Sequence, residues 1–186
     1  LEHEVGKGDF WKSLSATSEF QQPDSLKKAG FTMQLAALTG FHLPLIQQLQ
    51  RMRGQGRIGA MKDLARLDEA GWLDLVQQTG VPEGVPGVDA EARARAYAAA
   101  LYRQVEAAFP TVAIAAQIGK LGLQHQNEVQ EVFHANPDFD LLKHSVERDL
   151  GVDPPDPIKQ ELKQLQRLAR VTPQVRHIKA LIDAGD

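Results

Sequence analysis

Residues 89–111 are the stretch that most constrains the fold, because they carry the strongest helix signal in the chain. Asp89 can accept hydrogen bonds from the first free backbone amides, and the Ala-, Arg- and Leu-rich run after it favours a helix. Pro110 cannot continue that helix and moves Phe109 toward an extended conformation. Apolar residues recur at steps of three or four and predict one buried stripe, made of Ala94, Tyr97, Leu101, Val105 and Ala108.

Short capped helices separated by Gly or Pro account for the rest of the chain after its first 22 residues. No stretch alternates apolar and polar residues in the way a half-buried strand would. The chain is therefore predicted to be all-α, a compact bundle of about ten short helices in antiparallel hairpins without a sheet. The other helices are expected from Asp24 or Ser25 to 38, from 43 to the glycines at 54 and 56, over 62–67, after Asp68, from 110 to Gly119 or Gly122, over 124–135 and 141–150, from Ile158 to Ala169, and after Pro173.

Two segments are expected from this pattern. Residues 1–22 are predicted to be an irregular lead-in, because Gly6 and Gly8 disfavour an early helix. Residues 23–186 are predicted to be a single all-α domain, since the loop over 80–88 is too short to link two domains. The large apolar residues of the lead-in, which could dock on the body, are Phe10, Trp11, Leu14 and Phe20.

Composition removes several classes of function. The formal charge is −3 and the pI is about 6.1, so no overall field favours nucleic acid or an anionic membrane. The chain has no cysteine, which excludes disulfides, thiolate metal sites and a cysteine nucleophile. No apolar run approaches the roughly 18–20 residues of a membrane span, and the N-terminus has no apolar stretch of the signal-peptide type.

Residues 54–59 read Gly-Gln-Gly-Arg-Ile-Gly and match the glycine spacing of dinucleotide-binding loops. In those folds the glycines follow a strand, whereas residues 46–53 are predicted to be helical. A connection between two helices is therefore the preferred interpretation. A basic cluster around the same glycines could hold a phosphate or an acidic partner, although a solvated connection is favoured because no aromatic residues interleave with it. It consists of Arg51, Arg53, Arg57 and Lys62.

Glu131 and His134 have the Glu-x-x-His spacing found in di-iron carboxylate bundles. The motif occurs once rather than twice, so a solvent-facing pair is favoured. Asp138 and Asp140 lack the spacing and the glycine of an EF-hand, and no serine has a Gly-x-Ser-x-Gly setting. The sequence thus assigns no catalytic residue, no cofactor site and no metal ligand, and predicts a non-enzymatic chain. The remaining histidines are scattered and include His42, His125, His144 and His177.

Several short strings, taken in order, resemble the A component of Tc-type insecticidal toxin complexes. They cover roughly residues 31–183 and depart from the family near Ala169 and Val171. The strings are LAALTG at 35–40, LPL at 43–45, LARL at 64–67 followed by Trp72, YA at 97–98, VEAAFPT at 105–111, NPDFDL at 136–141, LQR at 165–167 and TP at 172–173.

The resemblance implies a helical shell segment near the N-terminal part of a large, pentameric toxin-translocation protein. Its expected partners are other domains or subunits of that protein and a target-cell surface, and its expected location is secreted or associated with a cell surface. No catalysis belongs to this region in the family. Two alternatives stay open: an independent α-helical adaptor or regulatory domain, and a small helical metalloenzyme around Glu131 and His134.

Overall fold

The computed structural model describes residues 23–185, so the lead-in predicted for residues 1–22 lies outside the described residues. The described part is all-α and contains no strand, which confirms the predicted fold class. Its helices are α2 (Pro23–Leu38), α3 (Leu43–Gly54), the 3₁₀ helix η2 (Met61–Arg66), α4 (Glu69–Thr79), α5 (Ala90–Ala108), α6 (Pro110–Ala116), α7 (Ile118–Leu121), α8 (Gln126–Ala135), α9 (Asp156–Val171) and α10 (Val175–Asp183).

Local capping signals set where several of these helices begin. Asp68 and Asp89 each accept a hydrogen bond from the backbone N–H three residues later, at 2.9 and 2.7 Å. Pro44 and Pro110 lie in the first turns of α3 and α6, where the missing N–H leaves no hydrogen bond unmade. These starts are confirmed as predicted.

Helix α5 buries most of its predicted stripe. Ala94, Tyr97, Leu101 and Val105 are buried, but Ala108 is exposed, so the prediction is wrong at that position. The chain turns into α6 at Phe109, which has φ −136° and ψ 57°, and the Phe109 ring packs against the core in place of Ala108.

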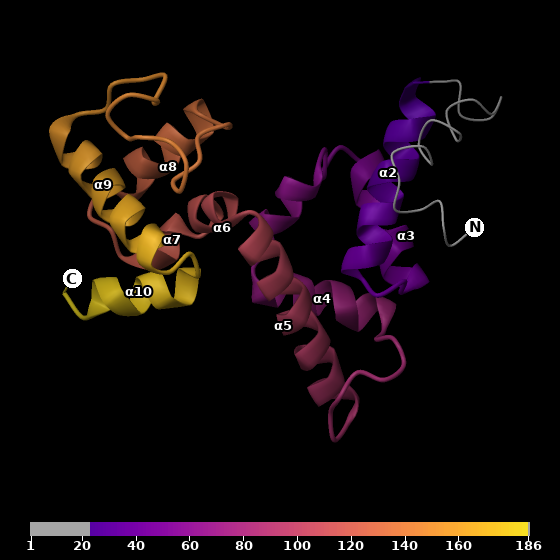
Figure 1. Ribbon diagram of the computed structural model, residues 1–186. Helices are drawn as coiled ribbons and strands as arrows, with labels where there is room; N and C mark the ends of the chain where they lie inside the picture. The colour runs from indigo at the N-terminus through magenta and orange to yellow at the C-terminus, as the bar shows by residue number, and fades with distance from the viewer. Residues whose placement is uncertain (1–22, 186) are drawn as a thin grey trace.

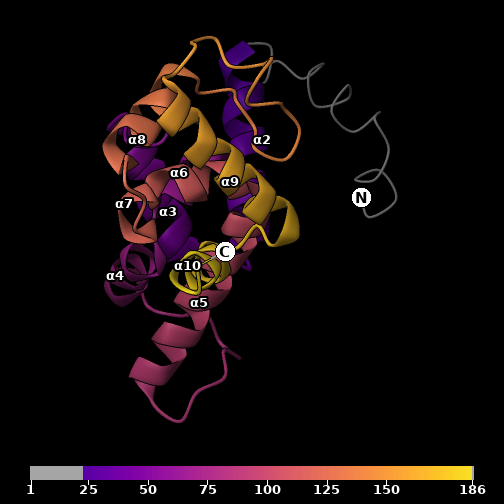
Figure 2. The same cartoon turned by 90° about the vertical axis from the view of Figure 1, so that its left-hand side faces the viewer.

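The two ends of the bundle meet along α5 and α6. Figure 1 shows α2, α3 and α4 on one side of this pair and α7 to α10 on the other, and Figure 2 looks onto the α8–α10 end. The buried apolar residues form one continuous cluster that extends from Phe31 in α2 to Ile178 in α10. The short helix η2 packs against α5 and α6, and α6 also contacts α7, α8 and α10 at the other end.

The helix predicted over residues 141–150 is absent, and two separate turns take its place. In a helix, the carbonyl of Leu141 would accept from the N–H of Ser145. Instead Ser145 donates to the Asp149 carboxylate at 2.6 Å, while Gln166 of α9 donates to the carbonyls of Leu141 and His144 at 2.9 and 2.6 Å. Hydrogen bonds to side chains thus occupy the backbone N–H and C=O groups that would pair with one another in a helix.

Within residues 23–185, no helix combines the length and the apolar character required to cross a lipid bilayer.

Candidate functional site

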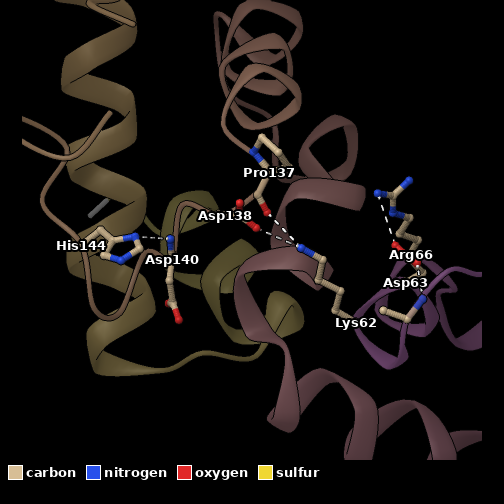
Figure 3. Close-up of polar contacts among 8 residues, drawn as sticks. Lys62, Asp63, Arg66, Pro137, Asp138, Asp140 and His144 are labelled. Atoms are coloured by element: carbon tan, nitrogen blue, oxygen red, sulfur yellow. Dashed lines mark hydrogen bonds and ion pairs between the residues drawn. The ribbon is translucent and has the colours of Figure 1, made fainter. Parts of the chain in front are cut away.

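One candidate site is the junction where η2, the start of α6 and the turn at residues 136–140 meet (Figure 3). Side chains from all three parts line a cavity of about 120 Å³ there. That volume holds several waters, but it is well below the roughly 300 Å³ at which drug-sized ligands begin to fit. Its lining includes Lys62, Arg66, Thr111, Phe133, His134 and Phe139.

The charges of η2 are mostly neutralised within the junction. Figure 3 shows Lys62 reaching the turn, where its ammonium lies 3.3 Å from the Asp138 carboxylate and 3.4 Å from the Pro137 carbonyl. The side chain of Asp138 is 94% exposed, and an ion pair this open to water contributes little to stability. Arg66 lies 3.5 Å from Asp63 on the same short helix.

Asp63 is held in its charged form by the backbone before η2. Burial by itself would raise its pKa, but hydrogen bonds from the N–H groups of Ala60 and Gly59, with the charges of Arg66 and Lys62, bring the pKa of Asp63 below its usual value. A carboxylate fixed in this way caps η2 and is a poor candidate for a general base, because such a base works best with a pKa near the operating pH.

Thr111 and Asp140 tie the turn to the start of α6. The Thr111 hydroxyl donates to Asp140 Oδ1 at 3.1 Å and accepts from the N–H of Leu141 at 3.0 Å. Asp140 also accepts from the N–H of Leu142 at 2.9 Å, and its own N–H donates to His144 Nδ1 at 3.0 Å. Burial would raise the pKa of Asp140, but the hydrogen bonds from Leu142, Lys143 and Thr111 lower it overall.

The glycine motif at residues 54–59 connects two helices, as preferred from the sequence. It begins at the last residue of α3 and ends before η2, and Gly56 adopts a left-handed φ of 74°. Because a helix and not a strand precedes it, the geometry of a dinucleotide loop is lacking. The basic cluster does not act as one group: Lys62 pairs with Asp138 across the junction, while Arg51 and Arg57 are exposed.

Glu131 and His134 are both exposed on α8. In the part of the chain from 23 to 185, no three His, Asp or Glu side chains gather closely enough to hold a metal ion. The other histidines of the described part contact separate partners: His42 with the Thr79 carbonyl, His125 with Glu161, His144 with the N–H of Asp140, and His177 with the Thr172 hydroxyl.

A buried polar network that the sequence reasoning missed joins α5 to α10. Glu106 is only 3% exposed and accepts hydrogen bonds from the Tyr102 hydroxyl at 2.7 Å and the N–H of Val175 at 2.9 Å. Gln117 donates to the Tyr102 oxygen at 3.1 Å. Burial is the largest cause of a raised pKa at Tyr102, so its hydroxyl remains a donor. The only sequence signal for this network was the i,i+4 spacing of Tyr102 and Glu106, which places both on one helix face.

Comparison of the chain with protein-family models, with curated proteins and with solved structures gives no match. The resemblance to Tc-type toxin A components therefore depends on the short strings quoted from the sequence.

Proposed function

We propose that the chain is a non-enzymatic structural and interaction module of a large toxin-translocation protein similar to the A component of Tc-type toxin complexes. In that protein it contributes a segment of the helical shell. Its partners are other domains or subunits of the same protein and a target-cell surface, and the protein is secreted or attached to a cell surface.

The observation that carries this proposal is that the strings behind the resemblance contact one another. Thr39, from the string at 35–40, accepts a hydrogen bond from the Tyr97 hydroxyl on its carbonyl at 2.7 Å. Thr111, from the string at 105–111, bonds Asp140 in the string at 136–141. Proteins that share a scaffold are expected to share the residues that hold its helices together. The contacts between these strings therefore support the resemblance.

The string at 165–167 takes part in the same way. Its Gln166 side chain, which is 8% exposed, donates to the Leu141 carbonyl at the end of the string at 136–141. Several polar groups of these strings thus make internal contacts. Such residues supply rigidity to a scaffold, which leaves the exposed helix faces to meet neighbouring parts of an assembly.

The first test is the open reading frame that encodes these residues, followed by purification of its product. We expect one large frame with these residues in its N-terminal part, and a pentameric product in light scattering. A stop codon shortly after the codon for Asp186, with no large downstream frame, would overturn the proposal in favour of an independent adaptor domain.

The second test addresses the metalloenzyme alternative through ligand binding. The chain is titrated with Mg-ATP and with Fe²⁺ in a calorimeter, and we expect no stoichiometric binding of either. Tight binding of Fe²⁺ that is lost in a Glu131→Gln variant would reject the scaffold and support the metalloenzyme instead.

A further inference from the structure

Positive charge is concentrated in residues 23–60, although the whole chain is formally negative. This segment has five basic residues against the single acidic residue Asp24. Two of the five, Arg51 and Arg53, lie in the last turn of α3, where a helix end favours cations. The dipole of α2 gives Lys27 and Lys28 no such stabilisation, because they lie near its N-terminal end.

None of these basic side chains forms an ion pair with an acidic residue between 25 and 185. The salt bridges there use other cations: Lys62, Arg66, Arg95, Lys120, His125, Lys143, Lys159, Lys163 and Lys179. The α2–α3 end of the molecule (Figure 1) therefore presents positive charge that the described residues leave unneutralised. An acidic segment would be complementary to it.

A groove between α2 and α3 is lined by two of these basic residues, Lys28 and Arg53, and by the ring of Phe31. Its volume is about 370 Å³, within the range of binding clefts. The Arg53 guanidinium lies 4.2 Å from the centroid of the Phe31 ring, and Gln50 donates to the Thr32 hydroxyl at 2.9 Å. With Lys28 also lining it, the groove fits an apolar side chain accompanied by carboxylates.

The segment that precedes α2 has this composition. Residues 1–22 contain four acidic residues, Glu2, Glu4, Asp9 and Glu19, against two lysines. They also contain four large apolar residues, Phe10, Trp11, Leu14 and Phe20. The segment therefore supplies both kinds of side chain that the groove would recognise.

The segment is also within reach. Lys28 and Thr32 follow Pro23 by five and nine residues in one helix, which places them about 8–14 Å along the axis from its start. A chain spans at most roughly 3.3–3.6 Å per residue, so about four extended residues cover that distance. From the charges and this geometry we propose that residues 9–20 of the same chain dock in the groove between α2 and α3, with an aromatic side chain against Arg53.

Tryptophan fluorescence of the full chain tests this docking. The chain has two tryptophans and Trp72 is fully buried, so subtracting the spectrum of Trp11→Phe isolates the emission of Trp11. We expect weak quenching of Trp11 by acrylamide in the parent chain and a several-fold stronger quenching after Arg53→Glu. Arg51→Glu is the matched control, because Arg51 is exposed on the same helix but does not line the groove.

Lys28→Glu is a second groove variant, used in case Arg53→Glu misfolds. Lys28 is exposed and also lines the groove. If Arg53→Glu reduces the helical circular dichroism, the Lys28→Glu result decides. Quenching of Trp11 that equals that of free tryptophan in the parent chain, or that neither groove variant changes, overturns the proposal. Protection of Trp11 that rises with protein concentration assigns the groove to a second copy and also overturns docking within one chain.

Discussion

At the scale of single residues, buried polar side chains link elements of the fold by hydrogen bonds. Thr111 is 8% exposed and uses its hydroxyl both as donor to Asp140 and as acceptor from Leu141. Glu106 likewise satisfies the first N–H of α10, an end of a helix that favours a negative charge. Each of these groups links two elements that lie far apart in the sequence.

Replacing Thr111 by Val tests how much the junction depends on that hydroxyl. The methyl group that replaces the hydroxyl can make neither hydrogen bond, and the buried N–H of Leu141 would lose its partner. We expect a loss of about 1–3 kcal/mol in the free energy of unfolding, measured by urea denaturation. Thr111→Ser keeps the hydroxyl and should lose clearly less. Equal losses in the two variants would show that packing, and not hydrogen bonding, matters at this position.

At the scale of elements, the loop before α5 is fitted closely to the helix. The backbone of Gly87 lies against Arg93, and a Cβ added at Gly87 would lie 2.6 Å from both Arg93 Cγ and the Arg93 backbone nitrogen. The Arg93 side chain also reaches the Pro82 carbonyl at 3.5 Å. The glycine is therefore required by the close approach of loop and helix.

We expect Gly87→Ala to destabilise the protein by roughly 1–3 kcal/mol, since the clash with backbone atoms forces the loop to shift. Gly30→Ala is the control: Gly30 lies inside α2, and a Cβ there would meet nothing within 4 Å. That change should be neutral or stabilising by up to about 1 kcal/mol. Thermal denaturation followed by circular dichroism measures both, and an unchanged midpoint for Gly87→Ala would contradict the fitted loop.

Helix α4 should respond to acid through its cap. The hydrogen bond from Lys120 is the largest cause that lowers the pKa of Asp68, followed by the one from the N–H of Gly71. A carboxylate whose pKa is lower in the folded state stabilises above its ordinary pKa and loses that contribution as the pH falls through the folded value.

Asp68→Asn keeps an oxygen that can cap α4 but removes the charge that pairs with Lys120. We expect the parent chain to be more stable than the variant at pH 7, and the difference to shrink as the pH falls below about 4. Urea titrations between neutral and strongly acidic pH measure the difference. A gap that stays constant over this range would show that the charge of Asp68 contributes nothing.

The elements could be predicted where their signals are local. Four helix starts are marked by a capping residue or a proline within one turn of the start: Asp68, Asp89, Pro44 and Pro110. The helix expected over 141–150 failed because its carbonyls are taken by Gln166, a residue 25 positions beyond Leu141. No pattern within the segment could reveal that competition.

The candidate site shows the same limit. The contact between Thr111 and Asp140 spans 29 residues and that between Lys62 and Asp138 spans 76. The sequence showed only that Asp138 and Asp140 lack the spacing and the glycine of an EF-hand, because their partners depend on how η2 and α6 pack. Buried Glu106 was missed for a related reason, since its acceptor role depends on where α10 begins.

At the scale of the whole molecule, the continuous core predicts cooperative unfolding. Buried residues from α2 to α10 belong to one cluster, so loss of packing at one end should weaken the other. In a Trp11→Phe background Trp72 is the sole tryptophan, and it reports on α4 at the α2–α4 end. Circular dichroism reports on all helices, and coincident transitions of the two signals are the mark of two-state behaviour.

Leu165→Ala in α9 separates a single cooperative domain from two independent halves. Leu165 is fully buried at the opposite end from Trp72, and truncating a buried leucine costs about 2–5 kcal/mol. If residues 23–186 unfold as one domain, the urea midpoint of Trp72 fluorescence should fall as far as the midpoint of circular dichroism. If the fluorescence midpoint stays at its parent value while the circular dichroism splits into two steps, the α7–α10 end unfolds by itself and the single-domain prediction is wrong.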